Sequence, residues 1–372
     1  MTRIVIVGGG IIGVAIARRL ARAGGDAEVV LCERNQLGGA TTARSVALFS
    51  WLSDAPTRFD LDLRWDAWAT YEPAIDAGAF SFERVGALLV AESDERREDH
   101  EAAARRYADL APDRDVAVLD PAELADLGVA PDGTAGGLYA PNVGYLDPHE
   151  VVTHWATEAR AAGASVWTDV AVTDVIQDGT GVTGVETTDG RVEADVVVNA
   201  AGPWAPRVND LVDVSLPLRH TRGPILVLDA GEPIDLPYVL FESGDYYRGE
   251  GATNALAGRL QKDFGRAERL DPDDPPGVDE SFYRDIADHT ASRVPRLAGA
   301  DVVNDWLGLR TVTPDKRPIL GPTAVDGFVV ACGPSGLGVT LAPTLADRLS
   351  VHLLEGTAID ERLAANRFAE PE

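Results

Sequence analysis

Four of the five residues at positions 3–7 are apolar and β-branched, which predicts a buried β-strand. A glycine cluster follows, and residues 12–23 then place apolar side chains at helical spacing before Gly24 and Gly25 end the pattern. A second apolar run at 28–32 completes a strand–helix–strand unit of about 30 residues. The chain therefore begins in the way that is typical of a parallel sheet covered by helices.

The rest of the chain mixes helices with short strands that are separated by turns. Asp-Gly and Thr-Gly turns from residue 165 onward predict a β-meander that runs into an apolar strand. Strand-like residues continue over 216–260, and the last predicted strand leads into a glycine-rich loop and a helix ending near residue 354. The predicted helices cover 94–110, 120–127, 148–162 and 281–294, and the predicted strands cover 165–169, 170–177, 181–187, 190–193, 194–199 and 328–331.

Composition narrows the classes of partner. The 372 residues include 60 acidic and 33 basic side chains, a net charge of −27, and 45% of the residues are hydrophobic. That hydrophobic share can build a folded core, whereas a disordered chain would be poorer in apolar residues. Nucleic-acid binding needs clustered basic side chains, and an anionic membrane surface repels an acidic protein. We therefore expect no nucleic-acid partner. No apolar run approaches the roughly 18 residues of a spanning helix, so we also expect no transmembrane segment.

The basic residues are almost all arginine, since Lys262 and Lys316 are the only lysines. An acidic surface that lacks lysine indicates a halophilic protein adapted to molar salt, where the screening length falls to roughly 3 Å. The alternative is an ordinary acidic protein from a GC-rich genome. Two cysteines form no disulfide framework and the histidines lack metal-ligand spacing, so we expect a cytoplasmic protein without a metal site.

The first candidate site lies between the first predicted strand and helix. Gly8, Gly10 and Gly13 form a G-x-G-x-x-G motif, in which the glycines allow a tight turn, close approach of a pyrophosphate and close helix–strand packing. Free amides at the helix start bind phosphates. Glu33 follows at the end of the second strand, where a carboxylate accepts hydrogen bonds from ribose hydroxyls. These residues predict a dinucleotide site, but they do not choose between a nicotinamide cofactor and FAD.

Longer motifs carry a family resemblance. The segments VIVGGGIIGVAIARRL, CERNQLGGATTARS, EADVVVNAAGPWAP, WLGLRTVTPDKRPILGP and ACGPSGLGVTLAP occur in this order along the chain. They resemble the D-amino acid oxidase superfamily of FAD-dependent oxidoreductases, and are most similar to glycine oxidase, sarcosine oxidase and D-amino acid dehydrogenase. The resemblance covers roughly residues 1–60, 140–225 and 300–350, and leaves 80–140 without a match.

The resemblance implies an α/β fold with an α+β substrate part. In it, a Rossmann-like FAD-binding domain of the glutathione-reductase type is intertwined with a mainly antiparallel β-sheet substrate domain. The expected FAD-binding segments are 1–80, 146–212 and 304–372, and the expected substrate segments are 81–145 and 213–303. Assembly into a homo-oligomer is left open.

The resemblance also assigns cofactor contacts along the whole chain. It places the pyrophosphate and adenosine half against one group of residues, the diphosphate against two threonine hydroxyls, adenine against a backbone segment, and the flavin ring between two loops. A helix opening near Gly338 would point its positive end at the flavin. The pyrophosphate and adenosine half would contact Ile11, Ile12, Glu33 and Arg34, the diphosphate would contact Thr41 and Thr42, and adenine would contact Val170. The flavin ring would lie between one loop with Val46, Ala47 and Leu48 and another with Gly333, Pro334, Ser335, Gly336, Leu337, Gly338 and Val339. The resemblance also assigns Ala201 and Gly202, at a strand end, to the cofactor site.

Three residues are the candidate catalytic set. Arg310 stands where the superfamily has its carboxylate-binding arginine, and a planar guanidinium binds a carboxylate in bidentate fashion. The alternative is a structural arginine paired with a carboxylate such as Asp315. Tyr246 and Tyr247 are candidates to complete the carboxylate site, but only one of two neighbours on a strand can face the ligand.

The resemblance implies an FAD-dependent amino acid or amine oxidase or dehydrogenase that acts on the C–N bond of a glycine, sarcosine or D-amino acid type substrate. Hydride would pass to flavin N5 and the imine would hydrolyse. No attachment residue is found where relatives link the flavin covalently, so non-covalent FAD is expected. The oxygen-activating lysine of sarcosine oxidase would fall near Ala255 or Leu256, both apolar, so O2 and an electron carrier remain alternative acceptors. The rival functions are a flavin-binding subunit of a multi-subunit amine dehydrogenase and a 2-hydroxy acid dehydrogenase.

Overall fold

The apolar run at the start of the chain becomes β1 (Thr2–Val7), a central strand of a six-stranded sheet in the computed structural model, which describes residues 2–368. β1 pairs in parallel with a strand on each side, and only the edge strand β19 runs antiparallel to its neighbour. Both faces of this sheet are buried, which explains why the sequences of its strands are continuous runs of apolar residues. The spatial order is β19 (Ile319–Pro322), β20 (Phe328–Cys332), β13 (Val196–Asn199), β1, β2 (Ala27–Cys32) and β9 (Ser165–Trp167).

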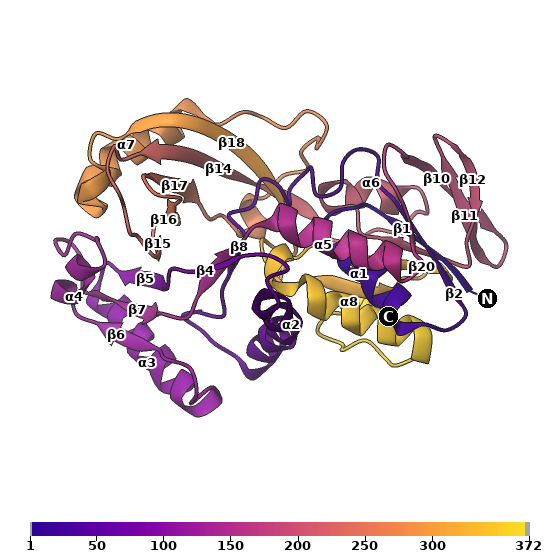
Figure 1. Ribbon diagram of the computed structural model, residues 1–372, viewed down its shortest axis with the longest axis horizontal. Helices are drawn as coiled ribbons and strands as arrows, with labels where there is room; N and C mark the ends of the chain where they lie inside the picture. The colour runs from indigo at the N-terminus through magenta and orange to yellow at the C-terminus, as the bar shows by residue number, and fades with distance from the viewer. Residues whose placement is uncertain (1, 369–372) are drawn as a thin grey trace.

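Successive side chains of β1 point to opposite faces of this sheet, because a strand has a period of two residues. Ile4 and Ile6 pack in the core shared with the covering helices, and Val5 and Val7 pack in the core on the other face. The first face is covered by α1 (Ile11–Ala23), α5 (Pro148–Ala161) and α8 (Gly338–Glu355), and the second by α6 (Ala205–Asp210) with the meander β10 (Val172–Asp178), β11 (Gly181–Thr187) and β12 (Gly190–Glu193) (Figure 1).

A second sheet of eight strands lies at the opposite end of the elongated molecule (Figure 1). Its pairs are antiparallel except for β15 with β5. Helix α7 (Glu280–Arg293) packs on one face of it through Phe282 and Ile286. The spatial order is β18 (Asp301–Val312), β14 (Arg219–Asp229), β17 (Asn254–Arg259), β16 (Asp245–Glu250), β15 (Tyr238–Leu240), β5 (Ala87–Ala91), β7 (Gly136–Ala140) and β6 (Ala117–Leu119).

Smaller elements connect the two sheets. A three-stranded sheet lies between them, and helix α2 (Arg58–Asp76) packs against α8. No helix is predicted from the sequence over 58–76, although Thr57 caps it by accepting a hydrogen bond from the amide of Asp60. The remaining elements are β3 (Leu48–Phe49), β8 (Gly144–Leu146), β4 (Phe82–Arg84), α3 (Asp94–Leu110), α4 (Pro121–Asp126) and the 3-10 helices Gly202–Trp204, Phe264–Arg266, Pro295–Leu297 and Ala365–Phe368.

The predicted fold class is confirmed, with one error in the meander. The sequence places the strand at 165–169 in the meander, whereas β9 pairs in parallel with β2 in the first sheet. Turn residues alone do not show which partner a short strand joins. The division of the chain into FAD-binding and substrate segments stays a prediction, and β18 crosses its boundary at residue 304.

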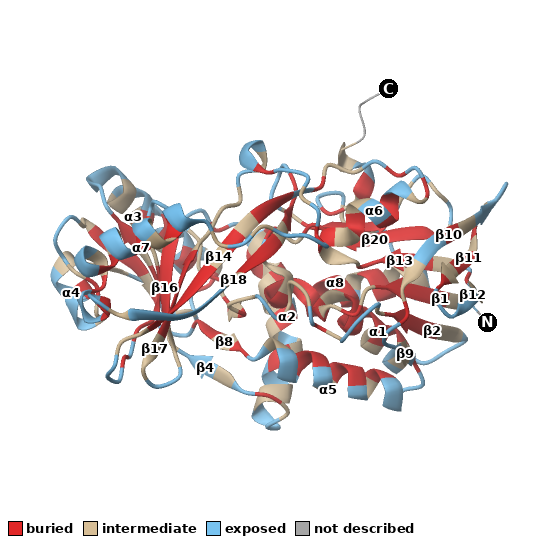
Figure 2. Cartoon of the chain, turned by 90° about the horizontal axis from the view of Figure 1, so that it is seen from above, coloured by how far each residue is buried: buried red, intermediate tan, exposed pale blue. Residues whose placement is uncertain are grey.

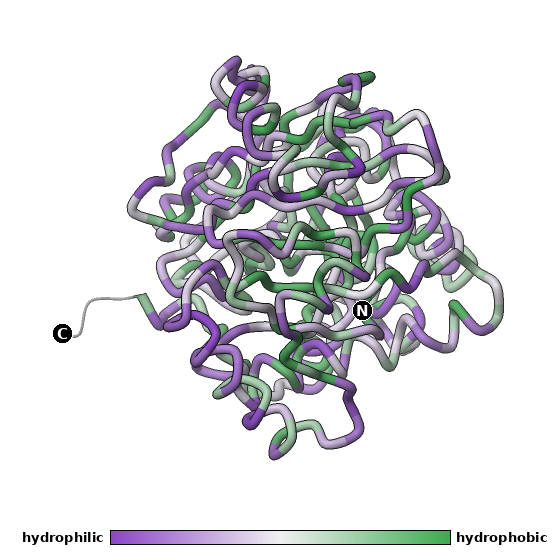
Figure 3. Tube along the Cα trace, turned by 90° about the vertical axis from the view of Figure 1, so that its left-hand side faces the viewer, coloured by the Kyte–Doolittle hydropathy of each residue, from purple (hydrophilic) through white to green (hydrophobic). Residues whose placement is uncertain are grey.

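Burial and hydropathy follow the same architecture. Figure 2 shows the buried positions gathered along the strands and on the inner faces of α1, α5 and α8, while α3 and the loops are largely exposed. Figure 3 shows hydrophobic segments mostly toward the middle of the molecule and hydrophilic segments mostly toward its outside. Within residues 2–368, no helix combines the length and apolar character needed to cross a bilayer.

Candidate active site

The glycine motif forms a close contact between α1 and β1. Gly8 has a φ of +106°, and a Cβ on Gly13 would lie 1.9 Å from the carbonyl oxygen of Gly8. No larger residue fits at Gly13 unless the helix moves away from the strand. A Cβ on Gly10 would meet nothing closer than the Thr42 hydroxyl at 3.5 Å. The motif therefore packs tightly on one side and is open on the other.

The open side presents groups suited to a dinucleotide. Gly10, the residue before α1, has no side chain to cap the helix, so the amides that follow Ile11 in its first turn are available to phosphate oxygens. The Thr42 hydroxyl accepts a hydrogen bond from the amide of Ile11 at 3.2 Å, which leaves its O–H free to donate. Glu33 accepts from the amide of Gly9 at 2.7 Å and from that of Asn35 at 2.9 Å, which fixes its carboxylate at the end of β2.

Two cavities of about 780 and 400 Å³ share lining residues and form one path from Glu33 to the second sheet. Their joint lining includes Gly10, Thr41 and Thr42. Predicted cofactor residues on the larger cavity are Gly8, Gly10, Glu33, Arg34, Thr41, Thr42, Ala201 and Gly202. Those on the smaller cavity are Gly10, Ile11, Ile12, Thr41, Thr42, Val46, Leu48, Gly202, Pro334, Gly336, Leu337, Gly338 and Val339.

Five predicted cofactor residues lie behind the cavity walls. Ala47 and Val170 are buried in the two cores beside the first sheet, and the neighbours of Val170, rather than Val170 itself, line the larger cavity. Gly13 packs against Gly8. The other two are Gly333 and Ser335. None of these five residues is among those that line the two cavities, and their contacts with FAD stay predictions.

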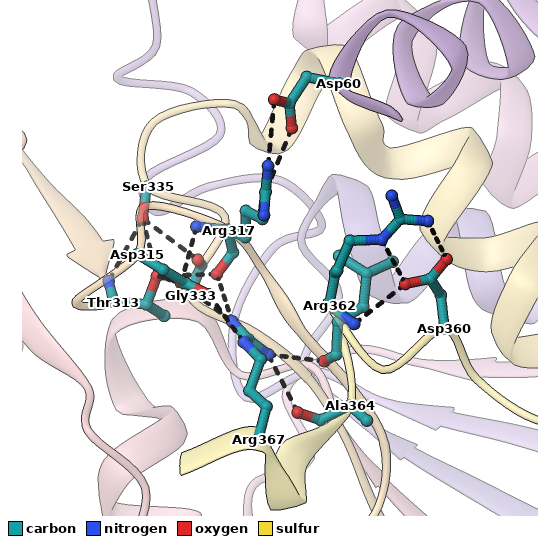
Figure 4. A network of polar contacts seen from close by, with 11 residues as sticks. Asp60, Thr313, Asp315, Arg317, Gly333, Ser335, Asp360, Arg362, Ala364 and Arg367 are labelled. Atoms are coloured by element: carbon teal, nitrogen blue, oxygen red, sulfur yellow. Dashed lines mark hydrogen bonds and ion pairs between the residues drawn. The ribbon is translucent and has the colours of Figure 1, made fainter. Parts of the chain in front are cut away.

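A polar network holds the loop that leads into α8 (Figure 4). The Ser335 hydroxyl accepts from the amide of Thr313 at 3.3 Å and donates to the carbonyl of Gly333 at 3.4 Å. The Thr313 hydroxyl donates to the carbonyl of Arg317 at 2.7 Å. Because both hydroxyls face into the protein, the following residues Gly336–Val339 are turned toward the cavity. The start of α8 therefore lies at the cavity wall.

Arg310 projects from β18 into the smaller cavity. Its guanidinium donates to the carbonyl of Arg222 at 2.9 Å and to that of Arg259 at 3.0 Å. A Cβ on Gly223 would lie 2.9 Å from the guanidinium carbon, so this glycine lets the side chain lie across β14. Asp315, the alternative partner suggested by the sequence, instead pairs with Arg367 at 2.8 Å (Figure 4). Arg310 thus lines the cavity without a carboxylate partner within residues 2–368.

The two candidate tyrosines face opposite sides of the second sheet. Tyr246 lines the cavity, and a Cβ on its register partner Gly258 would lie 2.3 Å from the Tyr246 hydroxyl oxygen. Burial raises the pKa of Tyr246, and the charge of Arg310 partly offsets this effect. Tyr247 forms a hydrogen bond of 3.0 Å with Thr290 of α7 on the far face. The structure therefore brings Tyr246, and not Tyr247, together with Arg310.

Two further cavity residues are missed by the sequence reasoning. Tyr238 lies against Tyr246, with ring centroids 5.3 Å apart. Lys262 follows β17, and burial, with the charges of Arg310, Arg64 and Lys316, lowers its pKa to about 8. Ala255 and Leu256 do not line the cavity. The rarity of lysine in this chain is the signal that would have singled out Lys262.

The acidic loop at 271–277 contacts the larger cavity. Asp273 accepts from Arg34 at 2.7 Å, from the indole of Trp204 at 2.9 Å and from Arg207 at 2.5 Å. Asp271 also pairs with Arg207. The side chain of Arg34 therefore forms an ion pair with the acidic loop and also lines the larger cavity.

The donors and the shape of this path suit an extended dinucleotide with a flat ring at its inner end. A match to the family described as "DAO: FAD dependent oxidoreductase" spans residues 3–350. The chain belongs to this family of FAD-dependent oxidoreductases, and FAD is its cofactor. The open glycine side and the fixed carboxylate of Glu33 fit the adenosine and diphosphate half of that group, and the smaller cavity fits the ring.

Curated relatives match nearly the whole of this chain. Mitochondrial dimethylglycine dehydrogenase of Rattus norvegicus is 27% identical over 95% of this chain and 43% of its own length. Glycine oxidase of Pseudomonas putida is 27% identical over 95% of this chain and 94% of its own. The chain thus spans less than half the length of the dimethylglycine dehydrogenases that it matches.

Solved structures share the fold. L-proline dehydrogenase from P. horikoshii has a TM-score of 0.87 at 21% identity and covers 99% of this chain and 97% of its own. Glycine oxidase from Geobacillus kaustophilus has a TM-score of 0.82 at 24% identity over the whole of both chains.

Proposed function

We propose that this protein oxidises the C–N bond of a small amino acid, of the glycine, sarcosine or D-amino acid type. The observation that carries the proposal is Arg310, a guanidinium without a carboxylate partner, beside Tyr246 and Tyr238 at the inner end of the cofactor path. A substrate carboxylate would complete this arrangement. The names of the relatives, which include a glycine oxidase and dimethylglycine dehydrogenases, support the same substrate class.

Arg310 binds and orients the substrate in this proposal. Its two hydrogen bonds to backbone carbonyls fix the guanidinium plane, so a bound carboxylate holds the α-carbon in one position. The Tyr246 hydroxyl, kept neutral by its raised pKa, supplies an additional hydrogen bond. Bound FAD would supply the hydride-accepting chemistry at N5 for the α-carbon held by Arg310, and the resulting imine would hydrolyse in water. The substrate amine enters as the free base in this proposal, so no side chain has to remove a proton from it, and among residues 2–368 no histidine lines the smaller cavity.

Two other functions have specific support. Oxidation of a 2-hydroxy acid requires a base for the hydroxyl proton, and Lys262 has a pKa that suits this role. A flavin-binding part of a larger enzyme is supported by the dimethylglycine dehydrogenases, which extend well beyond the region matched by this chain.

Anaerobic reduction of the flavin tests the proposal. The purified protein is mixed with a panel of amino acids, N-methyl amino acids and 2-hydroxy acids, and the loss of flavin absorbance is followed. Amino acids should bleach the flavin and hydroxy acids should not. Bleaching by hydroxy acids alone would overturn the proposal, and bleaching only after a partner protein is added would favour the subunit function.

We also propose that the FAD is held non-covalently. The protein should be yellow and should release its flavin on acid precipitation, because Ala43 and Arg44 and the stretch Gly308–Arg310 offer no attachment side chain. Flavin that stays with the denatured protein would contradict this. Reoxidation of the reduced enzyme by air, compared with a dye, then identifies whether O2 or a carrier is the acceptor.

A further inference from the structure

Four basic side chains line the smaller cavity, and three of them, which come from distant parts of the chain, do not also line the larger cavity. Arg310 comes from β18, Lys262 follows β17 and Arg64 comes from α2. A Cβ on Gly336 would lie 3.3 Å from Arg310 Cδ and 3.5 Å from Lys262 Cε, so these two side chains pass within about 7 Å of one another. The charge of Arg64 also acts on Lys262. The cavity therefore carries a concentrated positive charge.

No carboxylate within residues 2–368 forms an ion pair with these three side chains, although Asp54 lines the same cavity and the charge of Asp60 acts on Arg64. Nearby acidic groups are paired elsewhere, Asp60 with Arg317 at 3.3 Å and Asp54 with Arg96 at 3.0 Å. Asp245 is held by Arg259 and Arg293. Each of the three cavity cations lies farther than 4 Å from every described carboxylate, although the chain has 60 acidic residues. An excess of cations in a chain this acidic is the opposite of what its composition predicts.

The protein satisfies two of the three cations with neutral groups alone. Arg310 donates to two backbone carbonyls, and Arg64 donates to those of Ser50 and Asp60. Such contacts satisfy N–H groups but do not neutralise a charge. Lys262 makes no hydrogen bond to any described residue, and its burial lowers the pKa of its ammonium group. Placing like charges together in a water-poor cavity is unfavourable unless an anion joins them.

One carboxylate does not balance this site. In the proposed function, Arg310 takes the α-carboxylate of the substrate, and the oxidised flavin ring carries no net charge. Lys262 and Arg64 then remain without an anion. Arg44, which also lines this cavity, lines the larger cavity as well and is assigned to the cofactor side.

We infer that the substrate is an amino acid with a second carboxylate, bound at Arg310 through one carboxylate and at Lys262 through the other. Arg64 strengthens the binding from a distance. This inference rests on the proposed function and specifies its substrate class. Lys262 is then the residue that makes the site prefer a substrate with two carboxylates.

Non-reactive acids of equal carbon number test the inference directly. The FAD-loaded protein is titrated with succinate and with butyrate at constant ionic strength and pH 7, and the change in the flavin spectrum gives each Kd. Succinate should bind at least about tenfold more tightly than butyrate, which corresponds to one charge-assisted contact. Equal affinities in the unaltered protein would overturn the inference, and this comparison requires no variant.

Substitution assigns the preference to one side chain. In Lys262→Met the advantage of succinate should fall to less than about threefold, while the Kd of butyrate stays within about twofold. Lys316→Met removes the only other lysine, which is exposed and outside the cavity, and should keep the full preference. If Lys262→Met fails to fold, Lys262→Gln serves the same purpose.

The outcomes separate this inference from the proposed function. If the binding of butyrate depends on Arg310 and succinate binds no more tightly than butyrate, the inference of a second carboxylate is wrong and the proposed function stands. A preference that survives the loss of Lys262 also overturns it. If neither acid perturbs the flavin or competes with an amino acid substrate, the assignment of Arg310 as carboxylate anchor fails with it.

Discussion

The guanidinium of Arg34 forms an ion pair with Asp273, with 2.7 Å between Nη1 and Oδ1, and lies 4.2 Å from the centroid of the Trp204 ring. Arg34 follows β2 in the first sheet, whereas Asp273 belongs to a loop 239 positions later in the chain. Both residues line the larger cavity. The loop at 271–277 thus covers the end of the path assigned to the adenosine half of FAD.

This relationship predicts that Asp273 slows release of FAD. Burial opposes ionisation of Asp273, but hydrogen bonds from Arg34, Trp204 and Arg207 outweigh it and lower its pKa. Asp273→Asn should weaken these contacts and release FAD about three- to tenfold faster, since charge-assisted hydrogen bonds exceed neutral ones. Flavin fluorescence after dilution measures the rate. Asp274→Asn is the matched control, because Asp274 is exposed and makes no ion pair within the described residues, and an equal effect there would refute the prediction.

Arg310→Ala should retain FAD and lose most of its turnover with carboxylated substrates. Removing one partner of a charge-assisted pair in a water-poor site costs roughly 2–5 kcal/mol, which is about thirtyfold or more. The rate of anaerobic flavin reduction measures the loss. Arg222→Ala removes a guanidinium from the surface but keeps the carbonyl that accepts from Arg310, and should stay near the wild-type rate. An Arg310→Ala protein with unchanged kinetics would show that Arg310 is not the anchor.

The two adjacent tyrosines should respond differently to loss of their hydroxyl groups. Tyr246→Phe should raise the Kd for butyrate by about three- to tenfold, because its hydroxyl lies in the cavity with Arg310. Tyr247→Phe should leave this Kd unchanged and lower the free energy of unfolding by about 1 kcal/mol through loss of its bond to Thr290. Urea denaturation and flavin titration of both variants separate the effects. The reverse pattern would show that the faces are assigned wrongly.

The partly buried ammonium group of Lys262 should make stability depend on pH. Its pKa is about 8 in the folded protein against about 10.5 unfolded, so the unfolded state binds more protons between these values. Below pH 8 the folded protein carries a constant penalty. The free energy of unfolding should therefore rise, relative to Lys262→Met, by up to about 3 kcal/mol as pH increases from 8 to 10.5. Urea denaturation with saturating FAD measures it, and a difference that does not change with pH would contradict the assignment.

Added salt should raise the melting temperature. With 60 acidic and 33 basic residues, like charges lie within a screening length of about 30 Å in 0.01 M salt. Screening acts below roughly 1 M, and further gain should depend on the identity of the salt because it comes from strengthened burial. Melting is followed from about 0.1 to 2 M KCl with saturating FAD. A flat or falling melting temperature would remove the halophilic interpretation and leave the flavoenzyme assignment unchanged.

Features encoded over short stretches of chain are determined by the sequence alone. The βαβ start with Gly8, Gly10 and Gly13 is predicted correctly because strand, turn and helix each follow from residues within one hydrogen-bonding repeat. The family follows from short motifs in a fixed order, and FAD follows from the family. Charge and composition are likewise properties of the sequence.

Tertiary structure decided everything that joins distant segments. The choice of Tyr246 over Tyr247 depends on which face of β16 meets the cavity, and Gly258 on the next strand makes room for it. Lys262 becomes a cavity residue because the chain leaving β17 passes Gly336, 74 positions away in the sequence. Local periodicity carries no information about such pairs, since their contacts form only when the sheets and helices pack. The sequence supplies the charged groups, and the packing of the two sheets determines which of them are left without a partner.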